Sequence, residues 1–333
     1  MSRPLGMSTR QRWKRRIGGR GGGLAANYLG RPAARWIAAM SPSGSRDPVR
    51  RDRRDRALPV AIVTGGGRGL GRLVAQALAD NGFAVGLVAR SGDQLERSRR
   101  LIEASGGVAA ATRADVRDEQ ALRSAIARLR RWLGPVDLLV NNAGVPGPAG
   151  PSWEVDPGSW WETLGVNLGG TFACARSVLP DMVARRRGRI VNITSHAGVF
   201  RWPGVSAYSV SKAAVVKLTE NLAFETRRHG ISVFGVNPGI LPIGFSEAAL
   251  AHDTPYDSCL GRVHAWIRRE LDAGRGTDPA TAVDLVVRLS SGRYDALSGR
   301  QLSVHDDLDD VLERIDDVRH RELYVLGLQR LSA

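Results

Sequence analysis

The chain has 333 residues, of which 43% are hydrophobic and 24% charged, so it can bury a sizeable core in one large or two ordinary domains. This composition excludes a disordered or fibrous chain. No stretch approaches the roughly 20 apolar residues that a membrane-spanning helix needs, and the first residues lack a secretory apolar run. We therefore expect a cytoplasmic protein without a membrane span. The two cysteines, Cys174 and Cys259, lie far apart without nearby His or acidic clusters, which argues against a disulfide scaffold or a metal site.

The positive charge is concentrated at the N-terminus. The formal charge is +15, and residues 1–57 carry +12 of it, from 15 Lys and Arg against three acids. These residues are also rich in Gly, Ser and Arg, a composition that cannot build a core. We expect a disordered basic arm. A wrongly assigned start, a targeting segment, or contact with nucleic acid or an anionic membrane are the open alternatives.

From residue 58 onward, short β-branched runs alternate with helical patterns, which is typical of a parallel sheet covered by helices. Strands are expected at 58–64, 83–89, 108–112, 136–140, 189–194, 231–236 and 301–304. Helices are expected at 69–80, 93–105, 118–132, 167–187, 206–228 and from Pro279. The alternation predicts one α/β domain over 58–333 with a doubly wound parallel sheet of the Rossmann type. Within it we expect a lid insertion at about 244–276 and an acidic C-terminal tail at about 305–333.

A glycine-rich turn follows the first predicted strand and opens a helix, because residues 64–71 read TGGGRGLG. Glycines allow a tight turn and bring backbone N–H groups and a helix N-terminus against a pyrophosphate. The order strand, turn, helix therefore predicts a dinucleotide site.

The end of the second predicted strand indicates which dinucleotide binds. An acid usually stands there and accepts a hydrogen bond from the ribose 2′-hydroxyl, but this chain reads Val88-Ala89-Arg90-Ser91. Without the acid nothing repels a 2′-phosphate, and Arg90 together with Arg68 of the turn can bind one. We therefore expect NADP(H) to be preferred, with NAD(H) also possible. The alternative is that both arginines are merely solvated.

Further motifs stand at the ends of the later strands. Asn142-Ala143-Gly144 follows the fourth, Ser195 the fifth, and Asn237-Pro238-Gly239 the sixth, while Tyr208 and Lys212 form a Y-x-x-x-K motif. Ser195 precedes Tyr208 by 13 positions. In this combination the chain resembles the short-chain dehydrogenase/reductase family in its single-domain form. The resemblance covers about residues 58–304.

The chemistry of this motif can also be argued from the residues. Tyr208 and Lys212 are four apart on a predicted helix and so share a face, where the ammonium, together with the positively charged nicotinamide ring, can lower the pKa of the tyrosine. Tyr208 then serves as general acid/base, while the hydroxyl of Ser195 donates to the substrate oxygen. The resemblance implies that Lys212 also binds the nicotinamide ribose and that Asn167 holds a water in the proton relay.

The resemblance further implies where the cofactor binds, and it predicts no metal site. The implied cofactor-binding residues are Thr64, Gly65, Arg68, Gly69, Leu70, Gly71, Arg90, Asp115, Val116, Asn142, Ala143, Gly144, Tyr208, Lys212, Pro238 and Gly239.

The chain departs from the family pattern in two places. Ile243 stands where the family often has a Thr for the nicotinamide carboxamide, and Ser246 or backbone groups are the expected replacement. Residues 304–307 (VHDD) replace the usual V-D-G-G, which puts the family's C-terminal subunit contact in doubt.

His196 is expected on the opposite face of the strand from Ser195, because neighbouring strand residues alternate.

These features together predict an NADP(H)-preferring oxidoreductase that interconverts a secondary alcohol and a ketone. Its substrate wall is expected from 145–153, 200–202 and 244–276, where aromatic side chains favour an apolar or ring-containing substrate unless they are plain packing. We expect a homodimer or homotetramer through helices 167–187 and 206–228, with close approach at Ala173, Ala175, Ala213 and Ala214, and no obligate nucleic-acid partner. The rival hypothesis is a non-catalytic Rossmann-fold binding protein that acts through its basic arm.

Overall fold

The computed structural model describes residues 58–251 and 255–328. The basic arm expected at 1–57 lies outside the described residues. Seven strands are formed: β1 (Val60–Thr64), β2 (Ala84–Ala89), β3 (Val108–Arg113), β4 (Val136–Asn141), β5 (Gly188–Ile193), β6 (Ile231–Asn237) and β7 (Gln301–Ser303). The main helices are α3 (Gly69–Asp80), α4 (Gly92–Ala104), α5 (Glu119–Leu133), α6 (Pro157–Leu164), α7 (Gly170–Arg185), α8 (Ser206–Thr226), α9 (Ser246–Ala251), α10 (Cys259–Asp272), α11 (Pro279–Ser290), α12 (Leu308–Glu313) and α13 (Ile315–His320).

The strands form one parallel sheet in the order β3-β2-β1-β4-β5-β6-β7. All five residues of β1 are buried, as expected of a central parallel strand that is covered on both faces. The strand order reverses between β1 and β4, and ligands of such sheets bind outside the carboxyl ends of the strands at this switch point. The predicted doubly wound Rossmann fold is confirmed.

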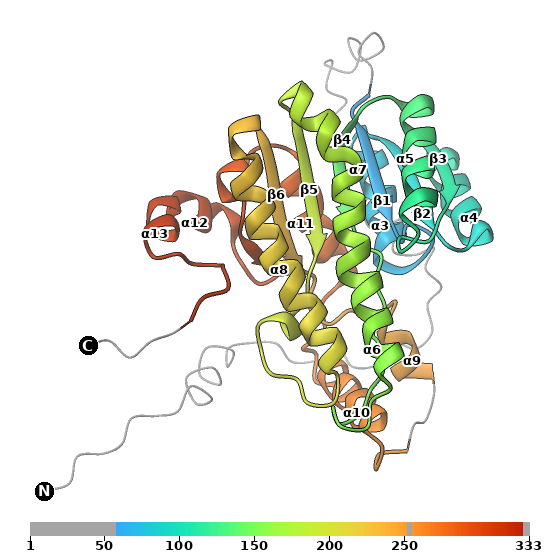
Figure 1. Ribbon diagram of the computed structural model, residues 1–333, viewed down its shortest axis with the longest axis vertical. Coiled ribbons are helices and arrows are strands. Elements are labelled where there is room, and N and C mark those ends of the chain that lie inside the picture. Colours follow the sequence, from blue (N-terminus) through green and yellow to red (C-terminus); the bar gives the residue numbers. More distant parts are fainter. Residues whose placement is uncertain (1–57, 252–254, 329–333) are drawn as a thin grey trace, which may run out of the picture.

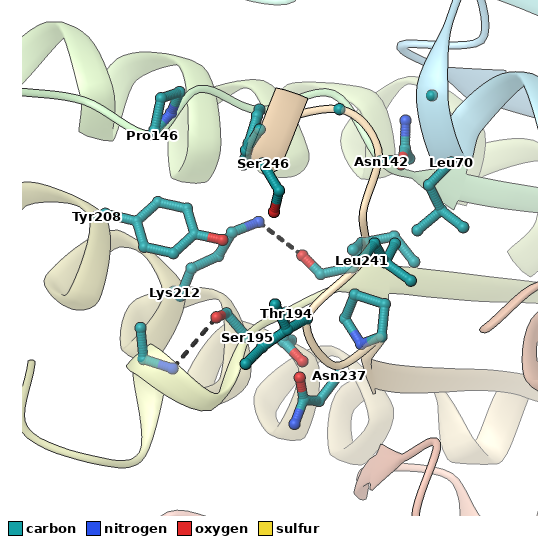
Figure 2. A pocket seen from close by; sticks show the side chains of 18 of the residues that line it. Leu70, Asn142, Pro146, Thr194, Ser195, Tyr208, Lys212, Asn237, Leu241 and Ser246 are labelled. Atoms are coloured by element: carbon teal, nitrogen blue, oxygen red, sulfur yellow. Dashed lines mark hydrogen bonds between the residues drawn. The ribbon is translucent and has the colours of Figure 1, made fainter. Parts of the chain in front are cut away.

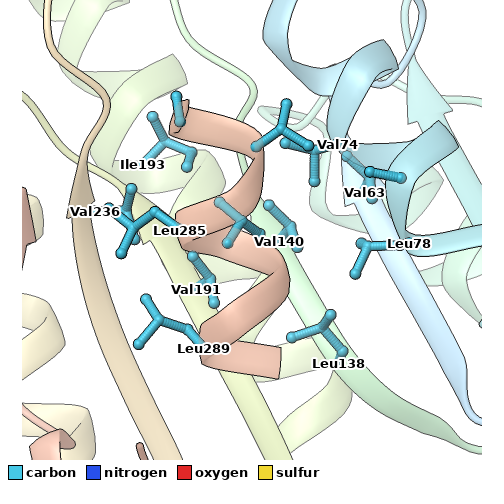
Figure 3. Packing of buried hydrophobic residues seen from close by; sticks show 14 of the residues in the cluster. Val63, Val74, Leu78, Leu138, Val140, Val191, Ile193, Val236, Leu285 and Leu289 are labelled. Atoms are coloured by element: carbon cyan, nitrogen blue, oxygen red, sulfur yellow. The ribbon is translucent and has the colours of Figure 1, made fainter. Parts of the chain in front are cut away.

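Helices cover both faces of the sheet (Figure 1). On one face α5, α7 and α8 pack on a core that includes Met182 and Leu222. On the other, α3, α4 and α11 enclose a second core, in which Leu285 and Leu289 of α11 lie over Val140 and Val191 of the strands (Figure 3). The two cores fix the strands, and with them the loops at their carboxyl ends.

One helix begins earlier than its sequence pattern predicted. The helix expected at 167–187 starts at Pro157 and runs through α6, a π-helical turn η2 (Gly165–Gly169) and α7. Asp156 caps it by accepting a hydrogen bond from the Ser159 N–H at 2.7 Å, and Pro157 suits the first helical position. The wider turn η2 turns Asn167 inward, where it is buried.

The acidic segment after β7 is folded onto the domain. Its short helices α12 and α13 bury Leu308, Val311 and Val318 in the same core as α11. The backbone N–H of Gln301 in the edge strand β7 donates to the Tyr324 carbonyl at 2.8 Å, so the C-terminal segment contacts this edge of the sheet.

The insertion expected at 244–276 contains α9 and α10, which lie together beyond the carboxyl ends of the strands (Figure 1). Among the described residues, no helix combines the length and apolar content needed to cross a membrane. Cys174 and Cys259 are both free.

Candidate active site

The glycine-rich turn is tied to the end of β4 by hydrogen bonds. The Thr64 hydroxyl oxygen accepts from the backbone N–H groups of Asn142 and Ala143, each at 3.1 Å. The Asn142 side-chain amide donates back to the Thr64 carbonyl at 2.9 Å. A Cβ on Gly71 would lie 2.4 Å from both the Asn142 amide nitrogen and the Gly65 carbonyl oxygen. Only glycine fits there, so β1, the turn and α3 are held in one arrangement.

The turn offers the groups that a pyrophosphate needs. Gly65 and Gly69 have φ of +66° and +53°, a region that glycine enters without strain. Helix α3 begins at Gly69, and no side chain caps its N-terminus. Residues 67–71 line the cavity, so the helix N-terminus lies at its wall, where the positive end of the helix dipole attracts an anion. This cradle fits a dinucleotide.

Both arginines that were predicted to read a 2′-phosphate line the cavity. Arg90 follows β2, is exposed and lines the cavity. Arg68 also lines the cavity, but its guanidinium donates to the carboxylate of Glu247 in α9 at 3.3 Å. Arg68 and Glu247 are both about half exposed, so their pairing is easily exchanged.

Asp115, which follows β3, pairs with Arg117 at 2.8 Å. The hydrogen bond from Arg117 is the main cause that lowers the pKa of the Asp115 carboxyl, with a smaller contribution from the charge of Arg90. Asp115 is therefore an anion at neutral pH and a hydrogen-bond acceptor at the wall of the cavity.

The predicted catalytic side chains converge from different elements (Figure 2). Ser195 follows β5, and its hydroxyl accepts from the Ala197 N–H at 3.2 Å, which orients the serine. Tyr208 and Lys212 lie in the first turns of α8, with the Lys212 Nζ 5.8 Å from the centre of the Tyr208 ring. The buried Lys212 ammonium donates to the Ile193 carbonyl at 2.7 Å. The hydroxyls of Ser195 and Tyr208 and the Lys212 ammonium thus face one space.

Asn167 lies behind this space and holds it together. Its side-chain oxygen accepts from the Val145 N–H at 2.8 Å, and its amide donates to the Val145 carbonyl at 3.0 Å and to the Ser211 hydroxyl at 2.9 Å. Ser211 in turn donates to the Tyr208 carbonyl at 2.7 Å. Asn167 therefore fixes the loop after β4 to the start of α8. In this structure its side chain serves as a positioning group.

Burial controls the protonation of the central pair. Burial raises the pKa of the Tyr208 hydroxyl, and a side-chain hydrogen bond with Ser195 partly opposes that rise. Burial also lowers the pKa of Lys212 to about 8. The predicted lowering of the tyrosine pKa includes the charge of a bound nicotinamide ring and stays a prediction; among this chain's own groups, desolvation has the largest effect on Tyr208. The resting site holds a protonated phenol beside an ammonium.

The structure places most of the predicted cofactor residues around one cavity of about 1550 Å³. Thr64, a predicted cofactor residue, and Asn167, a predicted catalytic residue, do not line it, because both are buried behind its wall. At the departure from the family pattern, Ile243 packs against the core and also lines the cavity. The buried Ser246 lines the cavity as well, with its hydroxyl turned toward Lys212 (Figure 2). The predicted lining residues that do lie there are Gly65, Arg68, Gly69, Leu70, Gly71, Arg90, Asp115, Val116, Asn142, Ala143, Gly144, Ser195, Tyr208, Lys212, Pro238 and Gly239.

Two expectations about the substrate wall are wrong. Trp153 is 84% exposed and does not line the cavity, since residues 151–155 turn outward before α6. His196 does line it, because β5 ends at Ile193 and a 3₁₀ turn, η3 (His196–Gly198), replaces the strand alternation. Sequence reasoning also missed Glu247 and Ser211, which carry no motif.

The described residues bring no three His, Cys, Asp or Glu side chains together as a metal site. A switch-point cavity with a glycine-rich cradle and a Ser–Tyr–Lys group defines a dinucleotide-binding oxidoreductase of the Rossmann class. Residues 59–251 match the family described as short chain dehydrogenase. The chain belongs to the short-chain dehydrogenase/reductase family and is an NAD(P)-dependent enzyme acting on CH–OH groups.

Named relatives place the chain among dehydrogenases and reductases. It is 32% identical over 244 residues to gluconate 5-dehydrogenase of Gluconobacter oxydans (strain 621H), an alignment that covers 73% of this chain and 92% of the relative. The structure resembles a variant of actinorhodin polyketide ketoreductase with NADPH (TM-score 0.68, 30% identity, 74% and 95% of the two chains). It also resembles NAD+-bound xylitol dehydrogenase (TM-score 0.66, 27% identity, 74% and 96%).

Proposed function

We propose that the protein is an NADP(H)-preferring oxidoreductase that interconverts a secondary alcohol and a ketone, with Tyr208 as general acid/base. The observation that carries this proposal is the convergence of the Tyr208 and Ser195 hydroxyls beside Lys212 at the cofactor cradle. An NADPH-bound relative and an NAD+-bound relative are both similar to this chain, and the exposed Arg90 with no acid at Ala89 favours NADP(H).

The chemistry assigned to each side chain follows from its position. In reduction, the bound nicotinamide cofactor supplies the hydride that adds to the carbonyl carbon and is itself oxidised. Ser195 donates a hydrogen bond to the carbonyl oxygen as negative charge develops there, and Tyr208 transfers its proton to that oxygen. The Lys212 ammonium stabilises the tyrosinate that remains and holds the ribose. The raised pKa of Tyr208 supports this direction, because a proton donor must be protonated at the start.

A cofactor-oxidation assay tests the function directly. Purified protein is mixed with NADPH or NADH and a panel of ketones, and with NADP+ or NAD+ and the matching alcohols. We expect turnover with at least one ketone, at a higher kcat/KM with NADPH. A protein that binds NADPH but turns over no member of a broad panel would favour the non-catalytic alternative.

The pH dependence of reduction should follow Lys212. The pKa of Lys212 is lowered from 10.5 to about 8, so the ammonium is present below pH 8 and lost above it. Tyr208 stays protonated over this range because its pKa is raised. We expect kcat/KM for NADPH, which reports the free enzyme, to fall about tenfold per pH unit above this pKa. Lys212→Arg keeps a charge and should move the fall to higher pH, whereas a profile flat to pH 9.5 would contradict the assignment.

We further propose that two copies associate through α7 and α8. Phe172 and Phe224 on these helices are 49% and 67% exposed, an apolar surface that association would cover. Ala175, expected at this contact, is instead fully buried within its own chain. Light scattering should give a dimer mass, and Phe172→Glu should give a monomer. A monomeric wild type at micromolar concentration would refute the proposal.

A further inference from the structure

Four aromatic rings form a continuous wall beside the catalytic serine. His196, the residue after Ser195, stacks on Phe200 with ring centres 4.0 Å apart and planes 13° apart. Trp202 meets His196 edge to face at 6.5 Å and meets Trp266 of α10 at 4.3 Å. All four rings line the cavity. We call them the aromatic wall.

The aromatic wall is not part of the protein core. None of its four rings belongs to either buried cluster or packs against one. Phe200 is 60% exposed, although it lines a cavity. His196 is exposed, Trp202 and Trp266 are half-buried, and aromatic side chains that line a concave site outside the core form a surface that a ligand can cover. The aromatic wall is therefore a suitable surface for a ring of the ligand to pack against.

The charges near the aromatic wall also restrict the ligand. Among the described lining residues Arg68 and Arg90 lie at the adenosine end and Lys212 lies beside Tyr208, so the cation left near α10 is Arg275. Arg275 is paired with Glu270 through two hydrogen bonds of 2.7 and 2.8 Å. Burial, and to a smaller extent His305, lowers the pKa of His196, so its imidazole is neutral at pH 7. Among the described lining residues, the cation beside α10 is therefore already paired with a carboxylate.

We propose that the aromatic wall selects flat, uncharged, fused-ring ketones and the corresponding alcohols over open-chain sugar acids. The ring system lies against His196, Phe200, Trp202 and Trp266, and its carbonyl reaches the hydroxyls of Ser195 and Tyr208. The proposal rests on the proposed function and specifies its substrate class. Stacking acts on the bound ketone and on the transition state alike, so its loss should appear in KM more than in kcat.

The test compares two ketones with NADPH: 2-tetralone, a fused-ring ketone, and 5-ketogluconate, an open-chain sugar acid. We expect kcat/KM for 2-tetralone to be higher by up to about 100-fold, since each of two ring contacts contributes up to about tenfold. Phe200→Ala and Trp266→Ala should each raise KM for 2-tetralone about tenfold. Trp153→Ala is the matched control, because it removes an indole that lies outside the cavity. Melting temperatures show that each variant is folded.

A binding measurement separates the substrate class from the reaction. 2-Naphthol has a flat fused ring but no carbinol hydrogen, so it can bind without reacting, and calorimetry measures its affinity in the presence of NADP+. If 2-naphthol binds wild type and Phe200→Ala weakens this binding about tenfold, the role of the aromatic wall is supported even when no ketone is reduced. The absence of ketone reduction would then count against the proposed function alone. Turnover of 5-ketogluconate at a kcat/KM equal to or above that of 2-tetralone overturns the substrate class and leaves the function intact. Failure of 2-naphthol to bind wild type also overturns it.

Discussion

Tyr208→Phe should abolish measurable ketone reduction while leaving the affinity for NADPH almost unchanged. The substitution removes one hydroxyl and keeps the ring, which contacts Phe245 edge to face at 6.2 Å. A general acid contributes about 10²- to 10⁴-fold, and Tyr208 combines a hydrogen bond with Ser195 and a position beside Lys212. We expect kcat to fall by at least that factor. Steady-state kinetics and NADPH fluorescence titration measure the two quantities separately.

Tyr256→Phe is the matched control for this experiment. Tyr256 is 63% exposed and does not line the cavity, so loss of its hydroxyl should leave kcat and KM unchanged. A Tyr208→Phe enzyme that retains kcat within about tenfold of wild type would show that Tyr208 is not the proton donor. An unchanged melting temperature excludes misfolding as the cause of a loss.

The fold was predictable because its signals are local. Parallel strands buried on both faces are continuous apolar runs, and β1 and β2 stand within two residues of their predicted bounds. Helix α3 begins and ends as its pattern indicated, directly after the glycine turn. Asp156 and Pro157 form a recognisable cap for the early start at Pro157, but the apolar periodicity alone indicates a helix only from Asn167 onward.

The site was predictable as far as it consists of motifs. Tyr208 and Lys212 share a helix face, and the strand ends brought Ser195 and Asn142 to the same edge of the sheet. The pairing of Arg68 with Glu247 joins residues 179 positions apart and leaves no local pattern. The inward turn of His196 depends on where β5 stops, which is the least certain part of a strand prediction. The outward turn of Trp153 depends on the same kind of loop geometry.

Ala89→Asp should reverse the cofactor preference from NADP(H) to NAD(H). Ala89 is the last residue of β2, and the cavity wall continues through it to Arg90. A carboxylate at this position accepts a hydrogen bond from a ribose 2′-hydroxyl and repels a 2′-phosphate. A hydrogen bond to a charged group changes binding by about 10- to 100-fold. The hydrogen bond gained with NADH and the repulsion of the NADPH 2′-phosphate both lower the ratio of the kcat/KM values for NADPH and NADH. We expect the ratio of kcat/KM values for NADPH and NADH to fall by at least about 100-fold.

Two single substitutions show which arginine reads the phosphate. Arg90→Ala should weaken NADPH binding about tenfold or more and leave NADH binding unchanged. Arg90 is exposed at the cavity, and in the described structure no carboxylate lies within hydrogen-bonding distance of it. Glu247→Gln keeps the size of the side chain but releases Arg68, so it should strengthen NADPH binding alone if Arg68 also reaches the phosphate. If the wild type has equal kcat/KM for both cofactors and neither substitution alters the ratio, the arginines are solvated side chains and do not read the 2′-phosphate.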